Sequence, residues 1–170
     1  MAITSNTSPI IALAKIGRLE MLKELYESVL ISPSVKEECI DRGRELGASD
    51  VRYIEKAIED GWIKSVKLDR RQRRTVNGLI SKAKIGLGEA EALVLAKGKN
   101  LLTTLDDKEA RAIARSLGVE HHGTVMILYE AYVKGSYDQL IEDLTKLSKV
   151  MWVSSDVMAE VIKRAKGVKR

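Results

Sequence analysis

Cysteine and proline are scarce in this chain of 170 residues, which contains one Cys and two Pro. The single cysteine, Cys39, excludes a disulfide bond within the chain and is typical of a reducing compartment. Its neighbours Val35 and Ile40 indicate a buried thiol, so Cys39 is given no chemical role. No stretch rich in Gly, Ser or Pro divides the chain, and this absence predicts a single domain.

Long hydrophobic segments are absent as well. The apolar run 10–14 is too short for a signal peptide or a membrane span, and no basic segment precedes it. We therefore expect a cytoplasmic protein without a membrane partner. No predicted strand is followed by a glycine-rich phosphate loop, which disfavours a small-molecule-binding α/β domain. Trp62, Trp152 and the tyrosines are scattered along the sequence, so a stacking platform for nucleic-acid bases is not predicted.

Positive charge, in contrast, is concentrated in one segment. The chain has a net charge of +5, and residues 63–84 contain eight Lys or Arg against a single acid, Asp69. Such a patch is suited to the phosphates of a polyanion, and a solvated helix face explains it equally well. Under the first hypothesis, the residues expected to contact nucleic acid are Arg70, Arg71, Arg73, Arg74, Lys82 and Lys84.

Short apolar strands alternate with helices over the first part of the chain. Strands are predicted at 2–5, 29–31, 62–66, 101–105 and 119–121. Helices are predicted from Ser8 to about Gly17, at 19–28, from 33 past Cys39, at 50–60, at 69–84, around Glu89, and from 106 or 107 to 118. This alternation predicts a three-layer α/β/α sandwich with a central parallel sheet. Helices at 124–134, 137–147 and 155–166 follow, so residues 1–170 are expected to form one domain, with a core of about 1–125 and a helical extension over about 124–170.

Acidic residues occupy positions that a soluble fold normally fills with apolar side chains. Glu89 lies on the same helical stripe as the small apolar residues of its helix, where a carboxylate is costly unless it is paired. The predicted buried strand 101–105 is followed by Asp106 and Asp107, and ligands bind at the carboxyl ends of parallel strands. Because these acids converge on one edge of the sheet, the sequence predicts a cation site.

Each of these residues also has a purely structural explanation. Residues 106–109 form an Asp-x-x-Glu capping box, and Glu89 lies in a first turn where the helix dipole favours an anion. Glu38 is expected at the edge of the core, where a salt bridge would account for it. Asn6 follows the first strand and is either an oxygen ligand or a helix cap. Together, however, Asn6, Glu38, Glu89 and Asp106 provide the oxygen ligands that Mg²⁺ or Mn²⁺ prefers.

The order of these motifs resembles the PIN-domain family, which includes the VapC-type toxin ribonucleases. The matching segments are Ile3-Thr-Ser-Asn-Thr-Ser-Pro9, Pro33-Ser-Val-Lys-Glu-Glu38, Gly88-Glu-Ala-Glu-Ala-Leu-Val-Leu-Ala96, Thr103-Thr-Leu-Asp106 and Gly118-Val119. The similarity extends over nearly the whole chain. It is greatest to a poorly characterised prokaryotic branch, in which a double acid is followed by an Ala-Arg pair, here Ala110 and Arg111.

This resemblance implies a PIN-like fold and a hydrolase: a Mg²⁺- or Mn²⁺-dependent endoribonuclease that cleaves phosphodiester bonds in single-stranded or structured RNA. It assigns catalysis to Glu38, Glu89 and Asp106. It assigns metal binding to Asn6, Glu38, Glu89, Asp106 and Asp107. It assigns supporting hydroxyl groups to Thr7, Ser8 and Thr104.

The departure from the family pattern is Asn6, which stands at the first acidic position. A neutral amide still binds a metal ion, but it removes one negative charge from the site and weakens activation of a water molecule. The alternative hypothesis is therefore a catalytically impaired PIN-like module that binds nucleic acid or protein. The resemblance also implies an antitoxin protein as partner. Apolar residues at helical spacing after residue 124 predict a homodimer, with core packing as the equal alternative.

Overall fold

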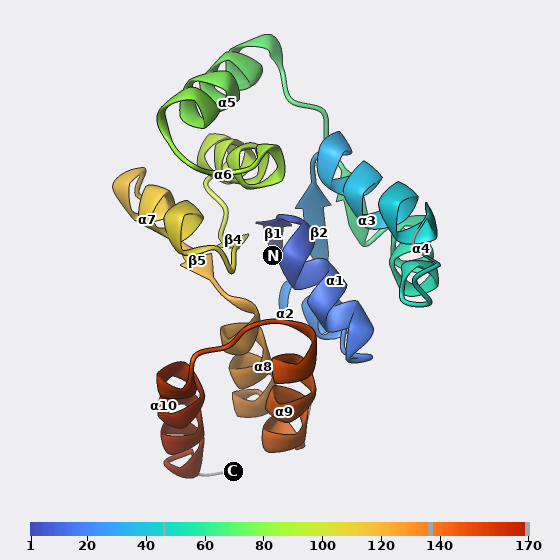
Figure 1. Ribbon diagram of the computed structural model, residues 1–170, viewed down its shortest axis with the longest axis vertical. Helices are drawn as coiled ribbons and strands as arrows, with labels where there is room; N and C mark the ends of the chain where they lie inside the picture. Colours follow the sequence, from blue (N-terminus) through green and yellow to red (C-terminus); the bar gives the residue numbers. More distant parts are fainter. Residues whose placement is uncertain (46, 136–137, 169–170) are drawn as a thin grey trace.

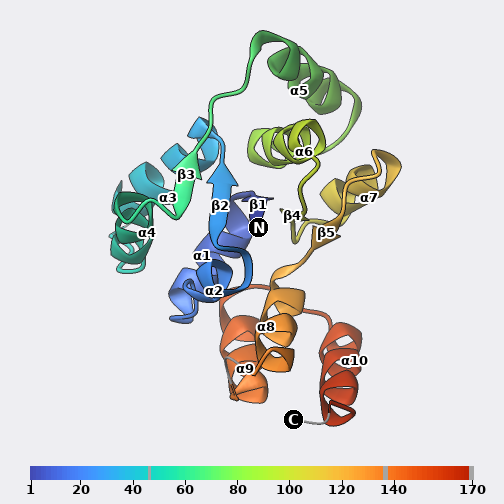
Figure 2. The same ribbon diagram turned by 180° about the vertical axis from the view of Figure 1, so that it is seen from behind.

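A central parallel sheet organises the molecule. The computed structural model describes residues 1–45, 47–135 and 138–168. Its five strands are β1 (Ala2–Ser5), β2 (Ser28–Ile31), β3 (Ile63–Ser65), β4 (Thr103–Thr104) and β5 (His121–His122). They pair in the order β3-β2-β1-β4-β5, and every pair is parallel (Figures 1 and 2). The five predicted strands are therefore present, and β1 is the central one.

Ten helices surround this sheet within the described part of the chain. They are α1 (Thr7–Lys15), α2 (Met21–Tyr26), α3 (Pro33–Glu45), α4 (Val51–Glu59), α5 (Arg70–Lys82), α6 (Leu87–Lys99), α7 (Lys108–Ser116), α8 (Thr124–Val133), α9 (Leu140–Val150) and α10 (Ser155–Lys166). The chain runs outward from β1 to β3 and then crosses back to β4 and β5. With right-handed crossovers, α1–α4 and α5–α7 cover opposite faces. The predicted α/β/α sandwich is confirmed.

The strand order creates a switch point between β1 and β4. Because the chain leaves these two neighbours in opposite directions, a crevice opens beyond their carboxyl ends, and ligands bind there in open α/β sheets. Residue Thr4 pairs with Thr103, and Ser5 pairs with Thr104. The residues that follow these strands, Asn6 and Asp106, therefore border the crevice.

The starts of two helices affect the site: the predicted start of α1 is wrong, whereas α7 starts after Asp107, one of its two predicted first residues. Helix α1 begins at Thr7 with Asn6 at its N-cap, whereas the sequence predicted Ser8 as the cap. Pro9 thus occupies the third helical position, where it has no N–H to donate to a capping side chain. Helix α7 is capped by Asp107, which accepts a 2.8 Å bond from the Ala110 N–H, so the capping box predicted for Asp106 and Glu109 is absent.

The C-terminal helices pack against the first helices of the chain. A single apolar cluster contains Ile10 and Leu22 of α1 and α2 together with Ile127 and Leu144 of α8 and α9. Figure 1 shows α8, α9 and α10 side by side below α1 and α2. Most of the spaced apolar residues that suggested a dimer are buried in the chain's own core, namely Ile127, Leu140, Leu144 and Leu147, while Met126 and Tyr129 are half-buried. The predicted helix at 137–147 appears as α9, and its predicted first residue, Tyr137, lies outside the described residues.

In the described ranges, no helix combines the length and the apolar character that a bilayer span requires.

Candidate active site

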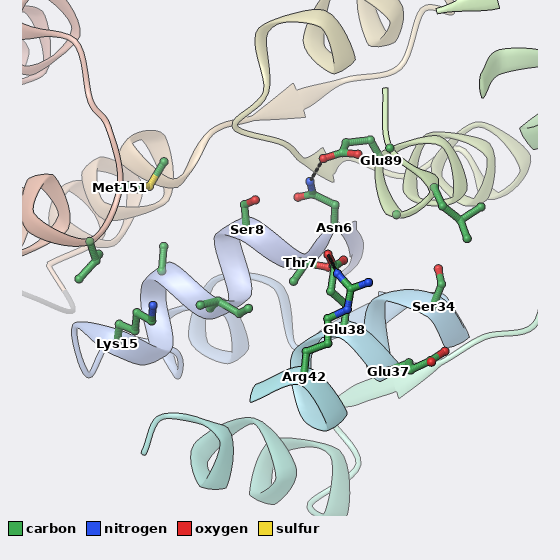
Figure 3. A pocket seen from close by; sticks show the side chains of 16 residues that line it. Asn6, Thr7, Ser8, Lys15, Ser34, Glu37, Glu38, Arg42, Glu89 and Met151 are labelled. Carbon is green, nitrogen blue, oxygen red and sulfur yellow. Dashed lines mark hydrogen bonds and ion pairs between the residues drawn. The ribbon is translucent and has the colours of Figure 1, made fainter. Parts of the chain in front are cut away.

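Asn6 is the central residue of the crevice. Its side chain is 2% exposed, and its Nδ2 donates a 3.1 Å hydrogen bond to Glu89 Oε1 (Figure 3). Its Oδ1 is also buried but has no hydrogen-bond partner among the described residues. An unpaired buried polar atom costs about 1–3 kcal/mol and is uncommon in native proteins. The Asn6 amide oxygen therefore keeps an unused acceptor position beside the cleft.

Two glycines at the start of α6 leave room for the acids of the crevice. At Gly86, the N-cap of α6, an added Cβ would collide with Glu89 Oε2, so the Glu89 side chain lies over the start of its own helix. At Gly88, an added Cβ would lie 3.2 Å from Val35 Cγ2 and 3.7 Å from Glu38 Oε2. The absence of a side chain at Gly88 lets α6 pack against α3, and Glu89 and Glu38 line the same cleft.

Glu38 is held by a hydroxyl and a guanidinium. Thr7 Oγ1 donates a 2.5 Å hydrogen bond to Glu38 Oε2, and Arg42 Nη1 lies 3.7 Å from Glu38 Oε1. The Glu38 side chain is still 44% exposed, so its carboxylate keeps access to solvent. The hydroxyl predicted to support the site at Thr7 thus contacts one of the predicted acids.

These groups line a cleft of about 660 Å³. Ser8, Lys15 and Arg42 also line it, and Val150 and Met151 border it from the end of α9 (Figure 3). Sequence reasoning did not assign Lys15, Arg42 or Met151 to the site. The four-residue spacing of Glu38 and Arg42 was a usable signal for Arg42. No local signal exists for Met151, because its position depends on how α9 packs.

Asp106 lies beside the same crevice but turns its carboxylate elsewhere. Its Oδ1 accepts a 2.8 Å bond from the Thr124 N–H, and its Oδ2 accepts a 2.6 Å bond from Thr124 Oγ1. Burial raises the pKa of Asp106, while the Thr124 bonds and the charge of Arg111 oppose this rise. Asp106 lines a neighbouring cavity and is not among the residues of the 660 Å³ cleft. Asp107 is exposed and serves as the cap of α7.

The Thr104 hydroxyl, which was predicted to support the site, does not line the cleft and lies between β1 and β4. Thr104 Oγ1 donates a 2.6 Å hydrogen bond to Ser5 Oγ, and Ser5 Oγ donates a 2.9 Å bond to the carbonyl of Asn6. Both hydroxyls are buried between β1 and β4. Thr104 therefore fixes the backbone at Asn6 rather than facing a ligand.

The basic segment is largely remote from this cleft. All six predicted nucleic-acid contacts, Arg70, Arg71, Arg73, Arg74, Lys82 and Lys84, are exposed. The start of α5 lies beside the end of α6, because an added Cβ at Gly98 would be 3.0 Å from Gln72 Nε2. Glu89 is at the other end of α6, and the 13 residues of α6 span about 20 Å. The arginines are therefore about one helix length from the cleft, whereas Lys84 nearly adjoins it in sequence.

Comparison with known proteins agrees with this architecture. The sequence model of a protein family described as a PIN domain matches residues 2–167. The chain belongs to the PIN-domain family. No curated protein matches it. PIN domains are generally nucleases that use divalent metal ions, so this chain has a nuclease-type fold, and the family predicted from its motifs is confirmed.

The acids of this PIN domain do not form a closed metal centre. In the described part of the chain, no three His, Cys, Asp or Glu side chains are grouped closely enough to hold an ion. Three carboxylates instead line the cleft, those of Glu37, Glu38 and Glu89, together with the Asn6 amide group, whose oxygen is unpaired among the described residues. Carboxylate and amide oxygens are ligands for Mg²⁺ and Mn²⁺. These donors fit a divalent ion of this kind, and they supply fewer negative charges than four acids would.

Proposed function

We propose that this PIN domain is a nuclease that depends on Mg²⁺ or Mn²⁺, and that its substrate is RNA. The observation that carries the proposal is the buried Oδ1 of Asn6, which has no hydrogen-bond partner among the described residues and belongs to a side chain in the cleft that Glu38 and Glu89 also line. Asn6, Glu38 and Glu89 would hold the ion. RNA as the substrate follows from the family resemblance, as does an antitoxin partner, whereas a cytoplasmic location was expected from the sequence itself. These and the homodimer stay predictions.

The chain's own groups would divide the work of phosphodiester hydrolysis. A bound divalent ion supplies Lewis acidity and lowers the pKa of a water molecule. Thr7 orients the Glu38 carboxylate, and the Asn6 amide group orients that of Glu89. Lys15 and Arg42 line the same cleft and would attract the phosphate and stabilise the charge that builds on it. Acids for a cation and bases for a phosphate in one cleft suit this chemistry.

Asp106 is expected to contribute less to ion binding than the acids of the cleft. Both of its oxygens already accept bonds from Thr124, so it has less capacity for an ion than Glu38 or Glu89. Asp107 is assigned a weaker role still, because one of its oxygens caps α7. The arginines of α5 would add contacts to the phosphates of a longer strand, and these contacts should be sensitive to salt.

Calorimetric titration with Mn²⁺ tests this proposal. Glu89→Gln should lower the Mn²⁺ affinity at least about tenfold, because it replaces a charged ligand. Glu91→Gln is the matched control: it makes the same change two residues along α6, where the carboxylate accepts a bond from Ser34 and does not line the cleft. Asp106→Asn should lie between the two. The proposal fails if the wild type does not bind Mn²⁺ or if Glu91→Gln weakens binding as much as Glu89→Gln.

One observation favours the alternative, a catalytically impaired binding module. The Asn6 side chain presents an NH₂ group to Glu89, where an acid would present a second negative charge. Cleavage of RNA oligonucleotides in Mn²⁺ should therefore be compared between the wild type and Asn6→Asp. Cleavage by the wild type supports the nuclease. Cleavage by Asn6→Asp alone supports the alternative.

A further inference from the structure

A second cavity adjoins the candidate active site. It has a volume of about 380 Å³ and lies between the start of α7, the residues around β5 and the connection from α9 to α10. Met151 lines both this cavity and the 660 Å³ cleft. A linear polymer bound in the cleft would therefore have a direct path over Met151 into the second cavity.

The second cavity carries positive charge on one of its walls. Lys108, Arg111 and Arg115 all line it. Their spacing of three and four residues places them on one face of α7. Among the described residues that line the cavity, Asp106 is the one acid, and both of its oxygens accept bonds from Thr124. The surplus of cations makes this wall suitable for phosphate groups.

Trp152 is the aromatic counterpart of these cations. Its side chain is 83% exposed, the highest value among the large apolar residues that the structure describes. It lines the second cavity from the connection between α9 and α10, whose end is fixed where Ser154 Oγ accepts a 3.2 Å bond from the Val157 N–H. Trp62, by comparison, is buried in the core. An exposed indole beside three cations is the combination with which proteins bind unpaired bases and their phosphates.

We propose that the second cavity binds single-stranded nucleic acid, with one unpaired base stacked on Trp152 and neighbouring phosphates at Lys108, Arg111 and Arg115. This inference rests on the proposed nuclease function, and it adds a binding site next to the cleft. It also gives a stacking role to Trp152, for which the sequence predicted none. The strand would run from the acidic cleft across Met151 to the indole ring. Selectivity for unpaired over duplex strands follows, because a paired base cannot stack on a side chain.

Tryptophan fluorescence provides a direct test that needs no divalent ion. In a Trp62→Phe background, Trp152 is the only tryptophan, so its emission reports on stacking. The probe is an oligouridylate of about 12 nucleotides, titrated in EDTA at low salt. Saturable quenching is expected. By anisotropy with a labelled probe, Trp152→Ala should bind about tenfold more weakly, whereas Trp152→Phe should retain most of the affinity because it keeps an aromatic ring.

A double variant tests the cationic wall. Lys108→Gln/Arg115→Gln removes two exposed charges of α7, and should weaken binding and reduce the slope of log affinity against log salt by about two. The matched control is Arg52→Gln/Lys56→Gln on α4, which makes the same charge change beside β3, at the opposite edge of the sheet. The control should bind like the wild type.

These outcomes separate this site from the proposed active site. Because the titrations contain no divalent ion, a failure of Mn²⁺ binding would overturn the nuclease proposal and leave the quenching intact. Unchanged Trp152 emission would overturn this inference. Equal weakening in the α4 control would also overturn it, since binding would then depend only on net charge.

Discussion

Two buried polar clusters lie at opposite ends of α1 and are partnered very differently. Beyond its C-terminal end, Arg18 Nε donates to both carboxylate oxygens of Asp143, at 3.0 and 2.9 Å, and Arg18 Nη2 donates to Gln139 at 3.1 Å. Asp143 is 1% exposed. At the N-terminal end, Asn6 makes one side-chain bond and leaves a buried oxygen with no partner in the described chain.

The difference separates a structural group from a candidate binding group. The Arg18–Asp143 pair joins the end of α1 to α9. The buried Asp143 carboxylate is tolerated there because both of its oxygens accept hydrogen bonds from Arg18. The buried Asn6 Oδ1 carries a desolvation cost that no hydrogen bond within the described chain offsets. A polar atom kept in this state is explained by a ligand that completes its coordination. The comparison therefore supports a structural role for one end of α1 and the proposed binding role for the other.

The largest effect on stability is expected at the structural end. Arg18→Met keeps much of the side-chain length but leaves the Asp143 carboxylate buried without its cation, which should cost about 3–5 kcal/mol of unfolding free energy in urea denaturation. Arg18→Met/Asp143→Leu should recover most of that loss, because it removes both charges. A loss below about 1 kcal/mol in the single variant would show that the pair does not hold α9.

An intermediate effect is expected when a charge is added at the binding end. Asn6→Asp replaces the donor to Glu89 by a second carboxylate, and two like charges at this buried position should cost about 2 kcal/mol in metal-free protein. Mn²⁺ should reverse the loss, since a cation between the carboxylates turns repulsion into coordination. Thermal unfolding in EDTA and in Mn²⁺ measures both quantities. If Mn²⁺ stabilises Asn6→Asp no more than the wild type, position 6 is not a ligand.

The sequence predicted the helices and strands well, but it predicted the orientation of the side chains at the site less well. Alternating strands and helices predicted the parallel sandwich because that pattern is local and repeated along the chain. The direction of the Asp106 carboxylate depends on Thr124, 18 residues later, and no local pattern encodes it. The Arg18–Asp143 pair joins residues 125 apart. Asn6 makes no capping bond, and one of the two N–H groups that a cap can use is missing at Pro9, a fact visible only once the helix start is known.

A smaller, pH-dependent effect is expected in a third cluster, which is partnered but only partly buried. His122 Nδ1 lies 2.8 Å from Glu130 Oε1, and Tyr26 donates a short bond to the other oxygen. The bond to Glu130 raises the pKa of His122 against the opposing effect of burial. Burial alone would raise the pKa of Glu130, but its bonds from His122 and Tyr26 lower it.

The sign of the pH effect follows from these shifts. His122 contributes stability that is complete below its unfolded pKa of about 6.5 and is lost as pH rises through its folded pKa. Between about pH 6 and pH 8, stability should fall by less than about 1 kcal/mol, since His122 is 30% exposed. His122→Gln should abolish this slope in urea titrations. His121→Gln is the matched control, because its ring contacts the Val119 carbonyl and not a carboxylate; a lost slope there would contradict the assignment.

The smallest effect on stability should come from Asn6→Ala, and its small size is the informative result. Loss of an N-cap side chain typically costs about 1 kcal/mol, but Asn6 makes no capping bond. Its removal also eliminates the unpaired oxygen, which offsets the lost bond to Glu89. We expect metal-free unfolding free energy to change by less than about 0.5 kcal/mol while Mn²⁺ affinity falls, a combination that a structural residue cannot produce. A loss near that of Arg18→Met would mean that both ends of α1 are structural.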